Sequence, residues 1–339
     1  MNWKRPGYLS DSASTVVYLP QQKTADGDIY SSETIFVPTD PSLTKTYKLP
    51  PSSTNKQKDV LASLVNLVKI AQKLILIGKR KMKVNKKGPG DFVTNIDKGI
   101  ELLFRDWIYL NFPHSKIIGE EGQKSKISEK DLVWYIDPID GTTNYIENKH
   151  EVTIHICAIK NGVPWISVVG IPNENATLGV SGQYIFSDSP SHMISSDKLM
   201  ICPDNVVGTE FRESSLVEKI SHDKIMDEFN CQHIKFNSIG FSILEMMRGN
   251  IQFFYKNNVK LWDIMAPLCL LRESGLFSIE LTIPELDLTI CPFSNDASFY
   301  KHLNDVHKKD CKVGLIIVTP KNMHNCSKKI KQIILDSSI

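Results

Sequence analysis

Hydrophobic side chains recur at a helical spacing soon after residue 55, where the character of the chain changes. Leu, Val, Ala and Ile side chains between Leu61 and Ile75 fall on one face at a 3.6-residue period. Ser, Thr and Asn at 52–55 supply N-cap residues just before this stretch. A second helical pattern runs from about Asp97 to Leu110. The sequence therefore predicts two helices, each with an apolar face, in this region.

Short runs of β-branched and aromatic residues then predict strands. Residues 133–136, Val-Trp-Tyr-Ile, form one buried run. The runs 153–159 and 163–170 flank Lys-Asn-Gly, which is a hairpin signature, and another short hairpin is expected around 181–182. Farther on, shorter strands alternate with helices, of which one is expected at about 242–248. This mixture predicts an α/β protein built in two halves.

Composition divides the chain into three parts. Residues 1–54 are rich in Ser, Thr and Pro and show no helical period, so we expect a flexible N-terminal arm. The aromatic residues of this arm allow a second interpretation, in which it packs on a partner subunit or over the functional site. An α+β half is expected over 55–190 and an α/β half over 191–339, with a boundary near residue 190.

The whole chain has the composition of a globular protein. It has 339 residues, of which 41% are hydrophobic and 23% charged, and a net charge of +2. This charge gives no bulk attraction to nucleic acid or membrane surfaces. We expect no segment of membrane-spanning length and no signal peptide. Seven scattered cysteines without a C-x-x-C pair fit reduced thiols, which predicts a cytoplasmic protein.

The sequence Asp-Pro-Ile-Asp-Gly-Thr-Thr-Asn places two carboxylates, Asp137 and Asp140, three residues apart after a buried run. Pro138 fixes the backbone and Gly141 permits a turn, so the strand is expected to end here. Carboxylates this close repel unless a cation lies between them, and oxygen ligands suit Mg²⁺ or Mn²⁺. A helix opening at Thr142 would offer free N–H groups to an anion such as phosphate. The motif predicts a metal beside a phosphate.

Three other acidic segments can complete such a site. Gly-Glu-Glu-Gly, with Glu120 and Glu121, follows the apolar pair 117–118 and therefore also lies at a strand end. Asp97 closes the segment Asp-Phe-Val-Thr-Asn-Ile-Asp between the two predicted helices. Asp263 follows a Trp and precedes a predicted helix. Taken singly, each is explained equally well as a solvated turn residue, a helix-start acid or an N-cap.

Together, G-E-E-G, D-P-I-D-G-T-T-N-Y, the upstream D-F-V-T-N-I-D and the downstream L-W-D resemble the inositol monophosphatase family in order and spacing. The resemblance covers about residues 57–280. This family belongs to the lithium-sensitive, metal-dependent phosphatases that include fructose-1,6-bisphosphatase. The resemblance implies a layered α-β-α-β-α sandwich, commonly a homodimer. It also implies a Mg²⁺-dependent phosphomonoesterase that hydrolyses a small phosphorylated polyol, with inositol monophosphate as the first candidate.

The resemblance further implies a set of metal ligands. It predicts a cluster of two or three Mg²⁺ ions, with Mn²⁺ as a substitute. The side-chain ligands would be acids from three of the four motifs, and one backbone carbonyl would join them. These ligands are Glu120, Asp137, the carbonyl of Ile139, Asp140 and Asp263.

Other positions take roles in catalysis and phosphate binding by the same resemblance. Asp97 and Thr142 would be the catalytic pair that orients or activates the attacking water. Gly141 and Thr142 would hold the substrate phosphate by their N–H groups. Glu121 would lie beside the metals, and Lys86 matches a lysine commonly found near this site.

The departures from the family pattern concern the substrate pocket. In this family a glutamate seven residues before the Trp-Asp aspartate commonly binds an inositol hydroxyl, and Lys256 occupies that position here. A cation in place of an acceptor carboxylate favours a second phosphate or another acidic group on the substrate. Gly240 preserves an S-x-G pattern, but Phe241 and Ser242 replace residues that are usually small. Pro267 stands near the start of the following helix.

Two alternatives stay open. A superfamily relative would act on a 3′-phosphonucleotide or a sugar bisphosphate. The sequence T-N-Y after D-G-T, in place of K-G-F, argues against the nucleotidase branch, whereas Lys256 favours a doubly charged substrate. A non-catalytic binding or regulatory protein is the other alternative, which the altered pocket supports and the retention of every acid opposes. The mechanism needs no histidine or cysteine, and His155 is expected to be a core residue.

Overall fold

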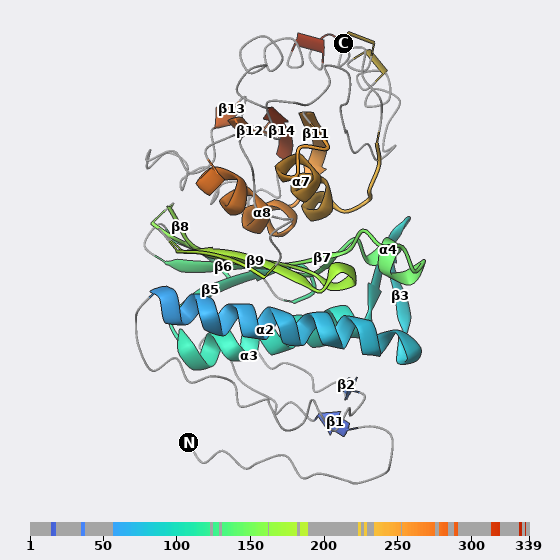
Figure 1. The fold of residues 1–339 in the computed structure, drawn as a ribbon, viewed down its shortest axis with the longest axis vertical. Coiled ribbons are helices and arrows are strands. Elements are labelled where there is room, and N and C mark those ends of the chain that lie inside the picture. The colour runs from blue at the N-terminus through green and yellow to red at the C-terminus, as the bar shows by residue number, and fades with distance from the viewer. Residues whose placement is uncertain are drawn as a thin grey trace.

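Layers of helix and sheet alternate through the molecule (Figure 1). Helices α2 (Gln57–Gly78) and α3 (Asn95–Asn111) cover one face of a six-stranded sheet. Helices α7 (Ile239–Met247) and α8 (Leu261–Ser274) cover its other face, and a four-stranded sheet lies beyond them. The computed structural model describes residues 15–17, 35–37, 57–122, 125–128, 131–161, 163–181, 184–188, 223–224, 227–228, 234–251, 253–274, 278–283, 288–290, 313–318, 332–333 and 336.

This helix–sheet–helix–sheet order matches the predicted sandwich through four of its five layers. The outer helical layer would fall on residues outside those described, as does the predicted boundary near residue 190. Within the predicted arm at 1–54, strand β1 (Thr15–Val17) pairs antiparallel with β2 (Ile35–Val37), which lies against α3. The rest of the arm is outside the described residues, so its flexibility stays a prediction.

The six-stranded sheet has the order β10-β9-β8-β7-β6-β5. Only the β5–β6 pair is parallel, and the others are antiparallel. Both predicted hairpins are confirmed, since β7 and β8 are joined across residues 161–162 and β9 and β10 across 182–183. The strands are β5 (Lys116–Gly119), β6 (Leu132–Asp140), β7 (Thr153–Lys160), β8 (Val163–Ile171), β9 (Ala176–Ser181) and β10 (Tyr184–Ser187).

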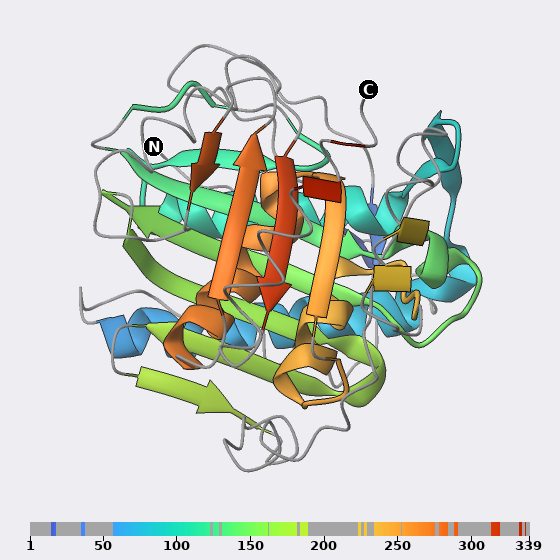
Figure 2. The same ribbon diagram turned by 90° about the horizontal axis from the view of Figure 1, so that it is seen from above.

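The four-stranded sheet is antiparallel, in the order β11-β14-β12-β13, and its strands run across those of the large sheet (Figure 2). A separate hairpin of β3 and β4 leads into α3. Short helical segments η1, η2 and α4 complete the described elements. The bounds are β3 (Val84–Gly88), β4 (Asp91–Thr94), β11 (Phe253–Val259), β12 (Ser278–Ile283), β13 (Leu288–Ile290), β14 (Val313–Val318), η1 (Lys79–Lys81), η2 (Pro172–Glu174) and α4 (Thr142–Ile146).

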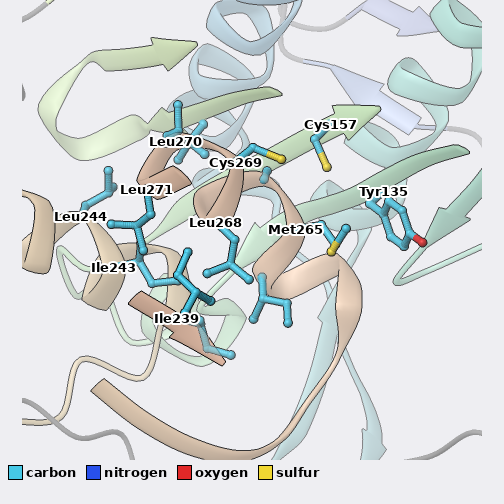
Figure 3. Close-up of a cluster of buried hydrophobic side chains, with 14 of the residues drawn as sticks. Tyr135, Cys157, Ile239, Ile243, Leu244, Met265, Leu268, Cys269, Leu270 and Leu271 are labelled. Carbon is cyan, nitrogen blue, oxygen red and sulfur yellow. The ribbon is translucent and has the colours of Figure 1, made fainter. Parts of the chain in front are cut away.

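The large sheet separates two hydrophobic cores. On β6, Trp134 and Ile136 pack toward α2 and α3, whereas Tyr135 packs toward α7 and α8 (Figure 3). Side chains alternate between the two faces of a strand. The next alternate residue of β6, Asp137, therefore belongs to the face that α7 and α8 cover. The pattern of β6 thus directs the first motif aspartate toward α8.

Helix α2 corrects one sequence expectation, because it is long and apolar enough to cross a membrane by length and composition alone. Its side chains Leu64, Leu67 and Val68 are fully buried beneath the large sheet. A core helix passes the same test of length and composition. We therefore interpret α2 as a core helix whose hydrophobic face is already covered by protein.

Candidate active site

The D-P-I-D motif lies on strand β6. The sequence predicted a buried strand over 133–136 that ends in the motif, and β6 continues through the motif to Asp140. The ladder tolerates Pro138 because its register against β7 shifts between Asp137 and Asp140. Asp137 then lies opposite His155, and Asp140 lies opposite Thr153. The bulge thus brings both aspartates beside the polar residues of β7.

Gly141 makes the turn that follows the strand. Its φ of 90° lies in the left-handed region, which favours glycine. A Cβ at this position would also lie 2.8 Å from the carbonyl oxygen of Glu151. Helix α4 begins at the next residue, and the buried Tyr145 fixes it by donating from its hydroxyl to the carbonyl of Ile75 at 2.8 Å. The predicted strand–turn–helix geometry is therefore present at the motif.

The carboxylate of Asp140 is held by neutral donors. Its Oδ2 accepts hydrogen bonds from Gly240 N at 2.6 Å, from Ser238 Oγ at 2.7 Å and from Thr153 Oγ1 at 3.0 Å. Its Oδ1 accepts from the N–H of Ile239 at 3.3 Å. Asp140 therefore caps the first turn of α7 and places Gly240, a predicted pocket residue, against the site.

Asp97 and Thr142, the predicted catalytic pair, are brought together across 45 residues of sequence. Thr142 Oγ1 donates to Asp97 Oδ1 at 3.0 Å and lies 3.0 Å from the carbonyl oxygen of Ile139. Asp97 Oδ2 accepts the N–H of Thr94 at 2.8 Å in a capping box at the start of α3. Burial raises the pKa of Asp97, although the hydrogen bonds from Thr94 and Thr142 oppose this.

Glu120 and Glu121 follow β5, and one lysine binds both. Lys87 Nζ is 2.8 Å from an oxygen of each glutamate. Burial raises the pKa of Glu121 to about 8, and the charge of Glu120 adds to this. Lys86, the lysine singled out from sequence, is exposed on β3 opposite Phe92. The register of β3 shifts between Lys86 and Gly88, and at this irregularity Lys87 is the lysine that reaches the two glutamates.

A buried ion pair supports the G-E-E-G turn from below. Arg105 donates from Nε and from a terminal nitrogen to Glu101 Oε1, at 2.7 Å each. The other oxygen, Glu101 Oε2, accepts the N–H of Glu121 at 2.7 Å. A Cβ on Gly119 would lie 2.3 Å from Glu101 Oε1, so the first glycine of the motif makes room for this pair. Sequence reasoning missed this support.

Asp263 lies inside the first turn of α8 rather than before the helix, because α8 begins at Leu261. Its Oδ2 accepts the N–H of Lys260 at 3.3 Å. Burial raises the pKa of Asp263 well above its usual range, and the charges of Glu120 and Asp140 add to this. Lys256 on β11 has the opposite effect, which places this predicted pocket residue within electrostatic reach of the site.

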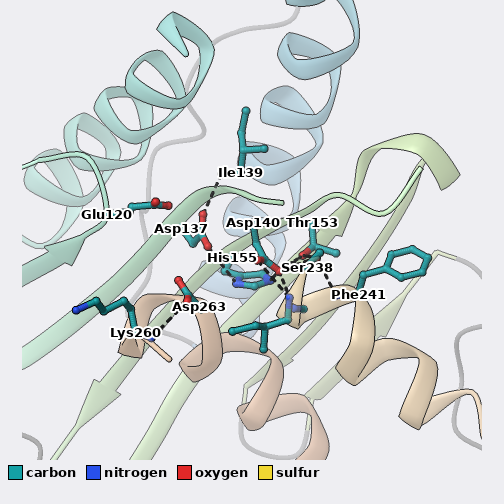
Figure 4. A network of polar contacts seen from close by, with 12 residues as sticks. Glu120, Asp137, Ile139, Asp140, Thr153, His155, Ser238, Phe241, Lys260 and Asp263 are labelled. Atoms are coloured by element: carbon teal, nitrogen blue, oxygen red, sulfur yellow. Dashed lines mark hydrogen bonds and ion pairs between the residues drawn. The ribbon is translucent and has the colours of Figure 1, made fainter. Parts of the chain in front are cut away.

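Asp137 is the most confined acid of the group (Figure 4). It is 1% exposed, and its Oδ1 accepts the N–H of Ile139 at 3.1 Å. Burial raises the pKa of Asp137 well above its usual range, and the charges of Glu120, Asp140 and Asp263 raise it further. The four acids predicted as metal ligands therefore lie close enough to repel one another electrostatically.

The donor set fits a hard divalent cation, because carboxylate oxygens that repel one another are relieved by positive charge between them. Within the described ranges, no three His, Cys, Asp or Glu side chains already stand in the geometry of metal ligands. The carboxylates would have to turn inward to share an ion. The positive charge of Lys87 lowers the pKa of Glu120 and so opposes the effect of its burial. The pKa of Asp137 is raised chiefly by burial and by the charges of other acids.

The pocket side of α7 is aromatic. Phe241, at 5% exposure, packs against Phe236 with ring centroids 5.3 Å apart and against His150 at 5.9 Å. Arg248 covers the Phe241 ring from 5.7 Å. The hydroxyl of the predicted pocket residue Ser242 donates to the Ser238 carbonyl of its own helix at 2.9 Å.

His155 is a site residue that sequence reasoning assigned to the core. On β7, Ile154 and Ile156 pack toward α2 and α3, whereas Cys157 packs toward α7 and α8. Strand alternation therefore puts Thr153 and His155 on the face that carries the acids. The signal was available in the sequence Thr-Ile-His-Ile, in which polar and apolar residues alternate directly after the D-P-I-D motif.

Comparisons with known proteins identify the family of this chain. The model of the inositol monophosphatase family matches residues 56–309. Inositol-1-monophosphatase from Bacillus subtilis is 46% identical over 199 residues, which are 56% of this chain and 72% of that protein. The Nus factor SuhB from Escherichia coli is 26% identical over 201 residues, covering 57% and 73% of the two chains. The chain belongs to the inositol monophosphatase family.

Solved structures show the same fold. A crystal structure described as an IMPase/NADP phosphatase complexed with Mg²⁺ and phosphate superimposes with a TM-score of 0.63. It is 18% identical in sequence and covers 82% of this chain and 95% of its own. At this identity the similarity confirms the predicted layered α/β sandwich.

Proposed function

We propose that the chain is a Mg²⁺-dependent phosphomonoesterase that acts on a small phosphorylated polyol, with inositol monophosphate as the first candidate substrate. The observation that carries this proposal is a cluster of mutually repelling acids, in which Asp137 and Asp140 are buried and Glu120 and Asp263 are half-buried. A metal-free fold gains nothing from such repulsion, whereas a divalent cation turns it into attraction. The Mg²⁺ and phosphate named with a structure of the same fold support this choice of ligands.

Bound divalent cations would lower the pKa of water and neutralise the charge of the phosphate. Asp97 and Thr142 would handle the proton. Because Thr142 Oγ1 donates toward Asp97 Oδ1, its lone pairs are free to accept a hydrogen bond from the attacking water. The proton would then pass from Thr142 to Asp97, whose pKa is raised by burial. The N–H groups of Gly141 and Thr142 would hold the phosphate.

Lys256 favours a second candidate class, in which the substrate carries a further acidic group. Its charge already acts on Asp263, so a substrate bound to the acid cluster would lie within electrostatic reach of this cation. A sugar bisphosphate or a 3′-phosphonucleotide fits this description. The structural neighbour described as acting on NADP in addition to inositol phosphate is consistent with that class. A homodimer and a cytoplasmic location stay predictions.

The test is phosphate release by the full chain from inositol monophosphates, fructose bisphosphate and 3′-phosphoadenosine phosphate, with Mg²⁺ and with EDTA. We expect release that requires Mg²⁺ and is lost in Asp137→Asn. Asp59→Asn is the matched control, because this aspartate is exposed in the first turn of α2 and should leave the rate unchanged.

The preferred substrate decides between the two classes. A preference for a doubly charged substrate that disappears in Lys256→Gln would assign the second class. Folded protein that binds Mg²⁺ but releases no phosphate from any of these substrates would contradict the phosphatase proposal. Such a result would favour the binding or regulatory alternative, and the similarity to a protein named as a Nus factor makes that alternative worth testing.

A further inference from the structure

A buried histidine stands inside the acid cluster, at a point that the proposed mechanism does not use. His155 has no solvent exposure, and its ring lies among Asp137, Asp140 and Asp263 (Figure 4). Its Nδ1 is 4.0 Å from Asp137 Oδ2, and its Nε2 is 3.7 Å from Asp140 Oδ2. The ring therefore bridges the two motif aspartates instead of packing in an apolar core.

The neighbouring hydrogen bonds decide which ring nitrogen carries the proton. Nε2 lies 2.9 Å from Thr153 Oγ1, and that hydroxyl also lies 3.0 Å from Asp140 Oδ2. The hydroxyl of Thr153 has a single proton. We assign this proton to the hydrogen bond that Thr153 donates to Asp140, because a carboxylate can only accept. Nε2 must then donate to Thr153, which leaves the lone pair of a neutral ring on Nδ1.

The surroundings of Nδ1 are rich in acceptors. Among the described residues it makes no hydrogen bond, and the backbone of Trp262 and Asp263 lies beside the ring. Asp137 Oδ2 faces it. The Asp263 carbonyl lacks its usual helical donor, because Pro267 stands four residues later and has no N–H. Lone pairs buried together in this way require a cation or a proton between them.

We propose that Nδ1 of His155 is a nitrogen ligand for a divalent cation that it shares with Asp137, so that the site prefers Mn²⁺, Co²⁺ or Zn²⁺ to Mg²⁺. Imidazole suits these transition metals, whereas Mg²⁺ prefers oxygen ligands alone. Two donors about 2.1 Å from a tetrahedral ion would lie about 3.4 Å apart. The observed separation is 4.0 Å, so the Asp137 carboxylate would turn slightly toward the ring to share the ion. The proposal rests on the metal site of the proposed function.

The packing of α7 fixes the ring in the required orientation. A Cβ on Gly240 would lie 2.1 Å from His155 Nε2 and 2.4 Å from Thr153 Oγ1. The helix therefore presses directly on the Nε2 edge of the imidazole and leaves the Nδ1 edge toward Asp137. This close approach explains why the position between Ser238 and Phe241 needs a glycine in this chain.

The direct test is pulsed electron paramagnetic resonance on the full chain loaded with Mn²⁺, which detects nitrogen nuclei bonded to the ion. We expect a nitrogen coupling that changes when histidine is labelled with ¹⁵N. The coupling should vanish in His155→Asn and persist in the control His114→Asn, since His114 is exposed in the turn after α3. The labelled wild-type spectrum decides the question even where His155→Asn does not fold.

Calorimetry of Mn²⁺ and Mg²⁺ binding separates ligation from a structural role. Loss of the nitrogen should weaken Mn²⁺ binding by about 10- to 100-fold, the range seen when groups that support a metal site are removed, and Mg²⁺ binding by a smaller factor. Bound Mn²⁺ without a histidine coupling, or equal weakening of Mn²⁺ and Mg²⁺ binding, would overturn the histidine ligand but leave the proposed metal site intact. Wild-type protein that is folded but binds no divalent ion would overturn the proposed metal site with it.

Discussion

Asp137 and Asp140 come from one motif and are both buried, yet their surroundings differ completely. Asp140 accepts hydrogen bonds from two hydroxyls and two backbone N–H groups. Asp137 accepts a hydrogen bond from the N–H of Ile139 on its own strand and faces the charges of three other acids. The first carboxylate is stabilised by the protein itself. The second is destabilised as an anion by burial and by the other acids, and a bound cation would relieve this.

This difference separates the scaffold of the site from its reactive part. Asp140 joins β6 to α7, and Glu101 with Arg105 joins α3 to the G-E-E-G turn, so these carboxylates have permanent partners inside the chain. Asp137 and Asp263 each accept a backbone N–H, from Ile139 and Lys260, and both face the charges of neighbouring acids. We infer that Asp140 and Glu101 keep the fold rigid, whereas the repulsion that acts on Asp137 and Asp263 provides the affinity for metal.

Removing the partner of a scaffold carboxylate should have the largest effect. Arg105→Met leaves Glu101 charged and buried, since the two side chains are 3% and 2% exposed. Breaking a buried pair in this way costs about 3–5 kcal/mol of unfolding free energy. Urea unfolding in EDTA measures this, with Arg80→Met, an exposed arginine in η1, as the control. Equal stability of the two variants would show that the pair does not support the fold.

The two motif aspartates should respond in opposite directions to the same substitution. In EDTA at pH 8, Asp140→Asn places an amide against the N–H of Gly240 and should lower the unfolding free energy by about 2 kcal/mol, the loss of a hydrogen bond to a charged group. Asp137→Asn removes a carboxyl that the metal-free fold must either protonate or leave repelling its neighbours, so it should raise the unfolding free energy. Urea unfolding of both variants measures these changes. If both substitutions change the unfolding free energy in the same direction, the contrast between the two aspartates is wrong.

The pH dependence should reveal the same repulsion without mutation. The pKa of Glu121 rises from its usual 4.5 to about 8 in the folded chain through burial and the charge of Glu120. The folded state therefore holds its proton more tightly than the unfolded state, so stability is greatest below pH 4.5 for this group and is lost as pH rises toward 8. Melting temperatures in EDTA should fall across this window, and saturating Mg²⁺ should flatten the fall. A rise across the window without metal would contradict the repulsion.

Periodicity and motifs in the sequence predicted the elements and the acids of this molecule. Helices α2 and α3 and both hairpins follow from local spacing, and the acids follow from short motifs that do not depend on distant contacts. The continuation of β6 through Pro138 was missed, because a register shift against β7 depends on tertiary pairing. The choice of Lys87 over Lys86 has the same origin in β3. His155 was missed because a buried histidine is usually a packing residue.

The smallest effect is expected at the lysine that binds the two glutamates of the G-E-E-G turn. Lys87 binds Glu120 and Glu121 at 2.8 Å and is 26% exposed, so water screens part of its charge. Its ammonium occupies oxygens that a metal would use at Glu120. Lys87→Met should therefore tighten Mn²⁺ binding by about fivefold, or about 1 kcal/mol, which is the upper range for a partly exposed pair. Lys86→Met, one residue away and exposed, is the matched control for calorimetry. Weaker Mn²⁺ binding in Lys87→Met alone would instead show that this lysine orients the glutamates for the metal, and would place it with Asp140 and Arg105 in the scaffold of the site.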